Sequence, residues 1–256
     1  MDTSAHNGAQ ASMAVPIQPC QRDLMPEEGM GSGEHVMPDG QTVMILVGAY
    51  FDHLYPLPEY AFLHQETLIK RYLEGLVEPC LILAMCAVTA QRLKFQPYYP
   101  GNVSGWVKRA EEDLMHNIGA PSIPRLQALV LVIRYMIDAG EFSKAFMLTP
   151  LTARAATALH LTRERPDVHF IAQETRRRLM WSCVLLDGHF SVGLREYQMC
   201  PRDVIEIQLP CPEQAFQDGT PTITAPLRSV SADSVELLSS CAAAVRMRFI
   251  RGDIMK

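Results

Sequence analysis

The histidines and cysteines of this chain could do chemistry only if the fold brought them together, because their local spacing does not. The chain has eight His and seven Cys residues, but it contains neither an HExxH motif nor a CxxC pair, the short signatures of zinc sites. Ser104, in PGNVSGW, is not in the GxSxG turn of a hydrolase. We therefore expect reduced, buried thiols of an intracellular protein, and no cofactor or metal ion in this chain.

A basic triplet followed by an apolar run and one acid is the second chemically distinctive feature. Residues 174–190 read ETRRRLMWSCVLLDGHF. Three arginines without interleaved aromatic residues make a small nucleic-acid footprint, so we interpret Arg176 to Arg178 as a solvated helix start. The functional alternative is that one of them faces inward and pairs with a carboxylate. The apolar run predicts a buried helix, in which Asp187 needs a partner. We expect Arg154 to be that partner, with Arg178 as the second choice.

Length and composition indicate a globular protein with a sizeable core. The chain has 256 residues, of which 48% are hydrophobic and 20% charged, so disorder throughout is excluded. The net charge of -5 gives no overall attraction to nucleic acid. The N-terminus lacks the pattern of a secretory signal. The longest apolar stretch, Cys80 to Ala90, is about half of what a membrane-spanning helix needs. We expect no membrane association.

The hydrophobic periodicity predicts an all-α fold after a disordered tail over residues 1–40. Pro150 lies inside one predicted helix, where it either kinks the helix or begins a new one capped by Thr149; we favour the kink. Val204 to Leu209 is the single stretch that alternates like a strand. Asp233 and Glu236 form a candidate capping box for the last helix. The predicted helices span about 42–55, 66–76, 79–92, 105–117, 122–140, 142–161, 171–194 and 234–250.

Four segments, in order, resemble the fungal-specific transcription factor domain, the middle homology region of the binuclear zinc-cluster regulators. They are LVGAYFDHLYPLPEYAFLHQETL (46–68), LILAMCAVTAQRL (81–93), LTARAATALHLTRE (151–164) and the ETRRRL to LLD segment described above. The resemblance covers roughly residues 43 to 210. It implies an irregular multi-helix regulatory domain.

The resemblance also marks a structural or regulatory core motif and two departures from the family pattern. The six-cysteine cluster that holds two zinc ions in the family's DNA-reading module is absent, so zinc is expected only in that missing module. The usual Gly-Arg-Pro turn after the long helix is replaced by Leu194, Arg195 and Glu196. The residues that the resemblance assigns to the core motif are Arg154, His160, Glu174, Arg178, Trp181, Asp187 and Arg195.

We therefore expect a nuclear regulatory domain of a fungal transcription factor that controls RNA polymerase II transcription. It could respond to a small-molecule effector, form homo- or hetero-dimers with transcription regulators, and meet DNA only indirectly. Two alternatives stay open: an α-helical enzyme whose site forms only in three dimensions, and a dimerising modulator of a complete regulator. The expected organisation is a tail over 1–40, the regulatory domain over 41–215, and a loop with a C-terminal helix over 216–256.

The last helix carries an apolar face that needs a partner helix, so it must either pack on the core or stay partly exposed. This face consists of Val235, Leu238, Ala242, Val245 and Phe249. We expect the chain to be a truncated regulatory domain that self-associates through this face.

Overall fold

Nine α-helices and no strand make up the described part of the chain, which confirms the all-α fold. The computed structural model describes residues 37–94, 102–192, 194–227 and 239–254. The expected N-terminal tail lies almost wholly outside these ranges. The α-helices are α1 (Gly40–Ala49), α2 (Gln65–Leu73), α3 (Pro79–Arg92), α4 (Asn102–His116), α5 (Ile123–Asp138), α6 (Phe142–Ala158), α7 (Phe170–Ser191), α8 (Glu213–Gln217) and α9 (Ser240–Ile254).

Several helix ends follow directly from the sequence. The Ser122 hydroxyl accepts a hydrogen bond from the backbone N–H of Arg125 and caps α5 as expected. Pro79 occupies the first turn of α3, where its missing N–H costs no helical hydrogen bond. Gly140 ends α5 with a φ of +81°, which favours glycine over other residues. These local signals explain why the expected and observed bounds agree closely here.

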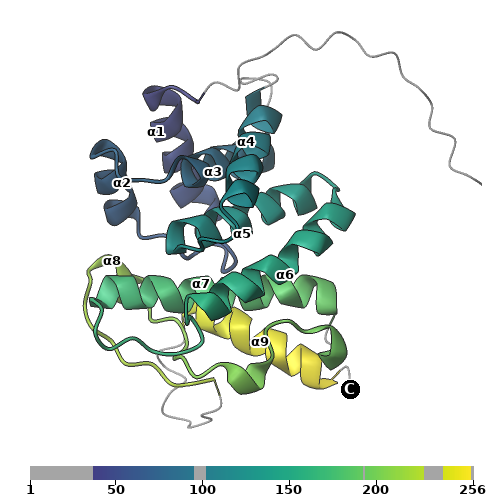
Figure 1. The fold of residues 1–256 in the computed structure, drawn as a ribbon. Helices are drawn as coiled ribbons and strands as arrows, with labels where there is room; N and C mark the ends of the chain where they lie inside the picture. The colour runs from purple at the N-terminus through teal and green to yellow at the C-terminus, as the bar shows by residue number, and fades with distance from the viewer. Residues whose placement is uncertain (1–36, 95–101, 193, 228–238, 255–256) are drawn as a thin grey trace, which may run out of the picture. The chain divides into compact units, whose positions relative to one another are not determined.

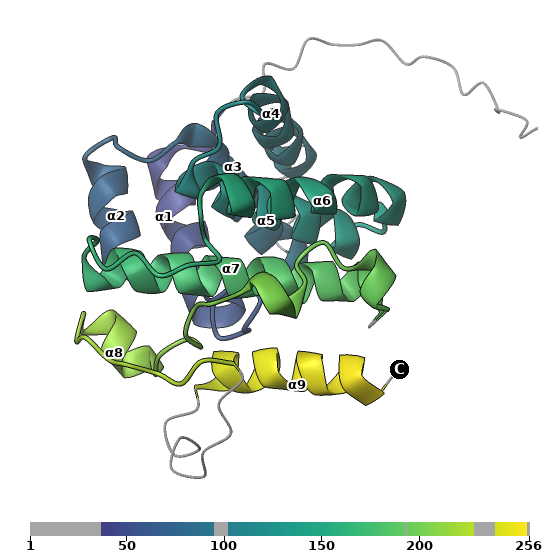
Figure 2. The ribbon, with the colours of Figure 1, turned by 60° about the horizontal axis from the view of Figure 1, so that its bottom comes forward.

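The centre of the core is built around α3 and α5. Every residue of α3 from Cys80 to Ala90 is buried, and α3 packs against α1, α4 and α5. The long helix α7 crosses this layer and contacts α5, α6 and α9 (Figure 1). The C-terminal helix α9 lies along α7 (Figure 2). Thus α7 is covered by helices from both earlier and later parts of the chain.

Two local expectations need correction in this part of the chain, and one is confirmed. The first helix changes at Tyr50 into a π-helix, η1 (Tyr50–Leu54), instead of staying regular. Pro150 lies within one continuous helix, α6, which agrees with the favoured alternative. The strand expected at 204–209 is reduced to one bridge between Gln208 and Pro226, after the 3-10 helix η4 (Arg202–Val204).

The last helix also differs from the expectation. The helix α9 begins at Ser240 and continues to Ile254, beyond the expected end at 250. Residues 228–238, which include the expected capping box, lie outside the described ranges; instead, the Ser239 hydroxyl accepts a hydrogen bond from Ala242 N at 3.1 Å. Among the described helices, none is long and apolar enough to cross a membrane.

Candidate functional site

A buried ion pair on α7 is the centre of the most extensive polar network in the described residues. Glu174 is fully buried and Arg178, one turn later, is 3% exposed. The Nε of Arg178 donates to Oε1 of Glu174 at 2.9 Å. The same oxygen accepts the backbone N–H of Cys211 at 2.9 Å. The spacing of four residues places the two side chains on one helix face, and Cys211 connects that face to the chain that follows α7.

The guanidinium of Arg178 joins three segments that are far apart in the sequence. Its Nη1 donates to Oε2 of Glu213 at 2.7 Å and to the Tyr55 hydroxyl at 3.2 Å. The Tyr55 hydroxyl in turn donates to Oε1 of Glu213 at 2.6 Å. The planar guanidinium lies 4.2 Å from the ring centroid of Phe216, a cation–π contact that adds to the pairing. One arginine therefore ties α7 to the end of η1 and to α8.

The neighbouring arginines are also engaged, so the expectation of a solvated triplet is wrong. Arg177 is buried and donates from Nε to Glu164 at 2.9 Å. Glu164 accepts the backbone N–H of Gln208 as well, at 2.9 Å. Arg176 is half-buried and donates to the carbonyl oxygen of Leu159 at 2.7 Å. The alternative that at least one arginine faces inward and pairs with a carboxylate is therefore correct.

Trp181 continues the same face of α7 one turn further on. It is 1% exposed, and its indole N–H donates to the carbonyl oxygen of Gln208 at 2.8 Å. Ser182 donates to the carbonyl oxygen of Glu59 at 2.7 Å. A buried indole normally requires such an acceptor, so Trp181 fixes both the packing and the path of the segment near Gln208.

This network leaves almost no space for a ligand. The cavity that touches Arg178 and Trp181 has a volume of about 10 Å³, far below the ~300 Å³ at which small-molecule sites begin. Although burial alone would raise it, the pKa of Glu213 is lowered by the Arg178 charge and by hydrogen bonds from Tyr55, Gln217 and Arg178. We interpret the network as a structural connection between segments.

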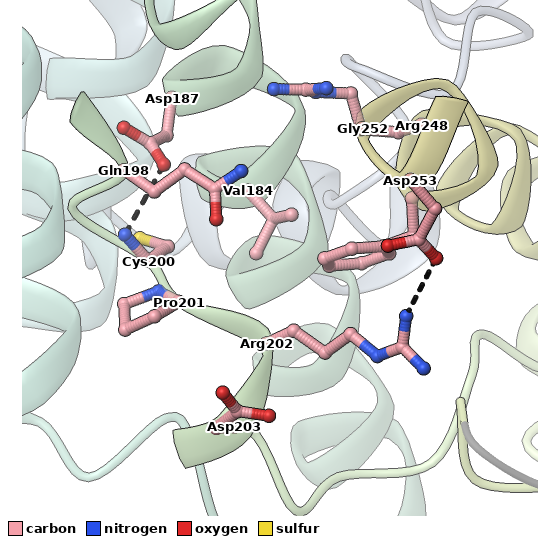
Figure 3. A pocket seen from close by; sticks show the side chains of 11 residues that line it. Val184, Asp187, Gln198, Cys200, Pro201, Arg202, Asp203, Arg248, Gly252 and Asp253 are labelled. Carbon is pink, nitrogen blue, oxygen red and sulfur yellow. Dashed lines mark hydrogen bonds and ion pairs between the residues drawn. The ribbon is translucent and has the colours of Figure 1, made fainter. Parts of the chain in front are cut away.

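A cavity of 490 Å³ lies on the other face of α7, beside Asp187 (Figure 3). Asp187 is 5% exposed, as expected. Its carboxylate accepts the backbone N–H groups of Met199 at 3.1 Å and Cys200 at 3.2 Å. Burial raises the pKa of Asp187, while these two hydrogen bonds and the charge of Arg248 oppose the rise.

The expected ion pair between Asp187 and Arg154 is wrong. Arg154 is exposed on α6 and lines a different, mainly apolar cavity of 310 Å³ with residues of α4 and α5. Arg178, the second choice, is occupied by Glu174 and Glu213. Backbone N–H groups of the loop after α7 satisfy the carboxylate instead. This arrangement orients the loop without a direct ion pair.

Arg248 of α9 also lines the Asp187 cavity, and its guanidinium reaches across to α7. Its Nη2 donates to the Ser191 hydroxyl at 3.0 Å. Its Nε is buried without a hydrogen-bond partner among the described residues. A Cβ atom added at Gly188 would lie 1.8 Å from this Nε, so glycine is needed for the close approach of Arg248 to α7. Burial lowers the pKa of Arg248, against the attraction of Asp187.

The rest of the cavity lining mixes apolar and charged side chains. Val184, Phe249, Cys200 and Pro201 supply apolar lining. At the rim, Arg202 pairs with Asp253 at 3.2 Å, and both side chains are substantially exposed (Figure 3).

The remaining members of the expected core motif do not gather here. His160 is exposed and ends the turn after α6 with a φ of +53°. Arg195 lies in the 3-10 helix η3 (Arg195–Tyr197), and its side chain is outside the described part of the structure. Thus the structure brings Glu174, Arg178 and Trp181 together on one face of α7, with Asp187 on another.

Sequence reasoning missed Tyr55, Glu164, Glu213 and Arg248. Glu164 is the last residue of the 151–164 segment, but nothing in its sequence surroundings indicates burial near Arg177. Glu213 follows Pro212 at the start of a five-residue helix, too short for a periodic signal. No local signal could have linked Arg248 to Asp187, because their contact depends on how α9 packs on α7.

The described cysteines lack the properties of nucleophiles or metal ligands. Burial raises the pKa of the Cys86 thiol to about 12 and that of Cys183 to about 12, so both are protonated at neutral pH. The six described cysteines are all free and buried. Within the described ranges, no three His, Cys, Asp or Glu side chains are grouped as a metal site would require.

Buried ion pairs hold the described helices together, and a cavity with mixed polar and apolar lining lies beside α7. The chain matches the family model of the fungal specific transcription factor domain over residues 47–239. It belongs to this family of transcription regulators. The expected resemblance is thereby confirmed, and the match extends past the expected end at 210.

Curated relatives agree with this family. The Zn(2)-C6 fungal-type transcription factor FTF1c of Fusarium oxysporum f. sp. lycopersici is 27% identical over 75% of this chain and 22% of its own length. FTF2 of the same fungus is 25% identical over 80% of this chain and 20% of its own. A transcriptional regulatory protein of Schizosaccharomyces pombe is 26% identical over 77% of this chain and 23% of its own.

This chain therefore spans about a fifth to a quarter of the curated relatives it matches. No solved structure matches it.

Proposed function

We propose that this chain is the regulatory domain of a nuclear transcription factor that controls RNA polymerase II transcription. The observation that carries the proposal is the family match over residues 47–239, a region whose described residues form one connected helical core. A regulatory rather than catalytic role is supported by the protonated, buried cysteines. The domain acts on transcription through the DNA-binding module and partner proteins to which it is coupled.

We also propose that DNA contact is supplied from outside these residues by a zinc cluster. The two Fusarium relatives carry Zn(2)-C6 in their names and are four to five times longer than the matched region. This chain has no CxxC pair and a net charge of -5, so it lacks both the ligand spacing and the overall basic charge that are usual for a DNA reader. Fluorescence anisotropy with duplex DNA should detect only weak, salt-sensitive binding without sequence preference.

We further propose that the domain responds to a small-molecule effector and pairs with a second regulator chain. The 490 Å³ cavity between α7 and α9 supports an effector, because its volume is within the range of small-molecule sites. Exposed apolar residues on α9 support pairing with a second regulator chain.

A tethering experiment tests the regulatory role. The full chain is fused to a bacterial DNA-binding domain and expressed in yeast with a reporter gene that carries the matching operator. We expect reporter transcription to differ from that with the DNA-binding domain alone. An Arg178→Ala fusion, in which the buried network is broken, should lose the difference, whereas an Arg163→Met fusion with an exposed change should keep it. Equal reporter levels for the parent fusion and the DNA-binding domain alone would contradict the proposal.

A further inference from the structure

A second cavity, of 480 Å³, is lined by residues of α2, of the start of α5 and of the start of α7; we call it the α2 cavity. Figure 2 shows α2 beside the first turns of α7. Leu68 is the single buried residue of α2, so this helix packs on the core less completely than α3 does. Leu76, which also lines the cavity, is 59% exposed, so the cavity opens at the surface.

Most of the α2 cavity surface is apolar. Its volume is within the range of small-molecule sites, which combine a mainly apolar lining with a few polar groups. An apolar surface of this size favours the apolar part of a ligand over water. The aliphatic side chains that contribute to it include Leu63, Leu68, Leu81, Ile123, Val168 and Ile171.

The charged side chains that line the α2 cavity all have the same sign. Arg71 of α2 and Arg176 of α7 line it, whereas no Asp or Glu does among the residues that the structure describes. This is opposite to the balance of the whole chain, which has 28 acidic and 23 basic residues. The lining therefore attracts an anionic group and disfavours a cationic one.

The helix starts at this cavity add to the positive potential. Thr67, Ile123 and Ile171 lie in the first turns of α2, α5 and α7 and line the cavity, and the N-terminal end of a helix carries a partial positive charge. Glu66 is exposed and does not line the cavity. Asp167, before α7, pairs with Arg165 at 2.6 Å. Neither acid therefore supplies a counter-charge inside the cavity.

Both arginines keep hydrogen-bond donors for a ligand. Nη2 of Arg71 donates to the carbonyl oxygen of Leu76 at 3.2 Å. Nη2 of Arg176 donates to the carbonyl oxygens of Leu159 at 2.7 Å and His160 at 3.2 Å. A guanidinium has five N–H donors, and backbone carbonyls occupy only some of them. The carbonyls thus orient the two side chains without neutralising their charges.

A buried amide in the cavity wall also has unused hydrogen-bonding capacity. Gln127 of α5 lines the cavity and is 5% exposed. Its Nε2 donates to the carbonyl oxygen of Phe62 at 3.2 Å, and the amide makes no other hydrogen bond among the described residues. Buried polar groups normally satisfy more of their capacity. The wall therefore favours a ligand that has a polar group as well as an apolar body.

We propose that the α2 cavity binds a small monocarboxylate with an apolar body. The carboxylate accepts hydrogen bonds from the lining arginines, and the apolar body lies against Leu68, Ile123 and Ile171. A planar carboxylate matches the donors of a guanidinium, whereas a doubly charged phosphate would cost more to desolvate in a mainly apolar cavity.

This inference goes beyond the effector response proposed for the cavity between α7 and α9, because it assigns a separate site with a stated ligand chemistry. Its biological consequence rests on the proposed regulatory function.

Thermal unfolding of the purified full chain with octanoate, 3-phenylpropanoate and indole-3-acetate tests the proposal. At about ten times its dissociation constant, a bound carboxylate should raise the melting temperature by roughly 3–6 °C. Each acid is compared with the primary amide and the primary amine of the same carbon skeleton. The amide should give a markedly smaller shift, because it lacks the charge, and the amine should give none.

Matched variants connect the effect to the site. The double variant Arg71→Gln, Arg176→Gln should lose the difference between acid and amide. Ala172→Trp, at an exposed position of α7 that lines the cavity, should lose the shift with every ligand, because the indole occupies the ligand space. Arg109→Gln, at an exposed position of α4 outside the lining, should retain the full shift. Each variant is compared with itself without ligand, so a change in its own stability does not affect the result.

Hydrogen exchange followed by mass spectrometry gives a second measurement. A bound carboxylate should slow exchange more in α2 than in α9, because the ligand packs against Leu68. The proposal is overturned if no carboxylate shifts the melting temperature, or if the amides act as strongly as the acids. It is also overturned if Ala172→Trp keeps the shift, or if exchange slows in α9 alone, since the ligand would then bind elsewhere.

Failure of this test is distinguishable from failure of the proposed function. A chain that alters reporter transcription in the tethering experiment but binds no carboxylate would keep its regulatory role and lose this site. Conversely, carboxylate binding without any effect of the chain on the reporter would support the site while contradicting the regulatory role.

Discussion

At the scale of single residues, the domain depends on carboxylates and arginines that cannot be replaced separately. Glu174 and Arg178 are almost completely buried, and together they form hydrogen bonds with five other residues. Removing one member of such a pair leaves the other charge in a desolvated position. The following predictions use this difference between buried and exposed pairs.

Arg178→Ala should lower the free energy of unfolding by about 3–5 kcal/mol, because Glu213 loses its counter-charge and the buried Glu174 keeps only the longer contact with Arg177 at 3.3 Å. Urea unfolding followed by circular dichroism measures this. Arg163→Met is the matched control: Arg163 pairs with Glu206 at 3.6 Å, and the side chains are 73% and 65% exposed. The control should change stability by less than about 1 kcal/mol. Similar losses of unfolding free energy in both variants would show that the buried network stabilises the domain no more than an exposed ion pair does.

Asp187→Ala should lower the free energy of unfolding by about 1–3 kcal/mol, because the N–H groups of Met199 and Cys200 lose their acceptor. Arg154→Met should change it by less than about 0.5 kcal/mol, since Arg154 is exposed. The double variant should show the sum of the two effects. Recovery of stability in the double variant would instead support an ion pair between Asp187 and Arg154, which the structure contradicts.

Stability in acid should depend on Glu213. Its pKa is lower in the folded protein than its ordinary value of 4.5, so the folded state favours the charged form. The stabilisation is therefore present above about pH 4.5 and is lost as the pH falls through the lowered pKa. Melting temperatures from pH 7 to pH 3 should fall less steeply for Glu213→Gln than for the parent. Parallel pH profiles would count against this assignment.

At the scale of elements, the contact of α9 with α7 depends on the absence of one side chain. Gly188→Ala would place a Cβ 1.8 Å from Nε of Arg248, so Arg248 must move and its hydrogen bond to Ser191 is lost. In the parent, the exchange should therefore be neutral or destabilising. In an Arg248→Ala background, the same exchange should stabilise the protein by about 0.5–1 kcal/mol, the usual gain of alanine over glycine in a helix.

A double-mutant cycle of Gly188 and Arg248 measures this coupling by chemical unfolding. Equal effects of Gly188→Ala in both backgrounds would mean that α9 does not pack on α7 through Arg248. Because the clash is with the end of a flexible side chain, the variant should still fold, and the cycle should remain interpretable.

Sequence patterns predicted the elements with strong local signals, and failed where tertiary packing decides. Pro79, Ser122 and Gly140 set helix ends that the structure confirms. The π-helix η1 has no distinct periodic signal, and α8 has only five residues. Within the candidate site, too, only the features with a local sequence signal could be predicted. Burial of Asp187 followed from its apolar surroundings, but its partners are backbone groups 12 and 13 residues away, which no side-chain pattern records.

At the scale of the whole molecule, α9 presents an apolar face that the described part of the chain leaves uncovered. Met247, Ile250 and Ile254 are 68%, 55% and 77% exposed, and their spacing of three and four residues places them on one side of the helix. The opposite side, with Ala242 and Val245, is the face predicted for self-association, and it packs on the core instead. The exposed side is the basis of the proposed self-association.

Sedimentation velocity of the purified chain should show a concentration-dependent shift from monomer to dimer. The double variant Met247→Lys, Ile250→Lys should stay monomeric, because lysine keeps helix propensity while removing the apolar contact. The substitution Lys144→Gln, at an exposed position on another helix, is the surface control. This variant should dimerise like the parent. A parent that remains monomeric at all concentrations would contradict the proposal.

The position of Glu213 sets a practical limit on how this region can be cut for recombinant work. Arg178 pairs with Glu213, which lies 35 residues later, and hydrogen-bonds to Tyr55, which lies 123 residues earlier. One guanidinium therefore connects segments that are far apart in the sequence. An expression fragment that stops at residue 212 would have an intact α7, but Arg178 would lose Glu213 and keep only Glu174 as its counter-charge. An end point at 215 would cut α8 before Phe216 and Gln217, which stack on or bond to the same cluster. Soluble fragments should therefore extend at least through Gly219, where the chain turns after α8.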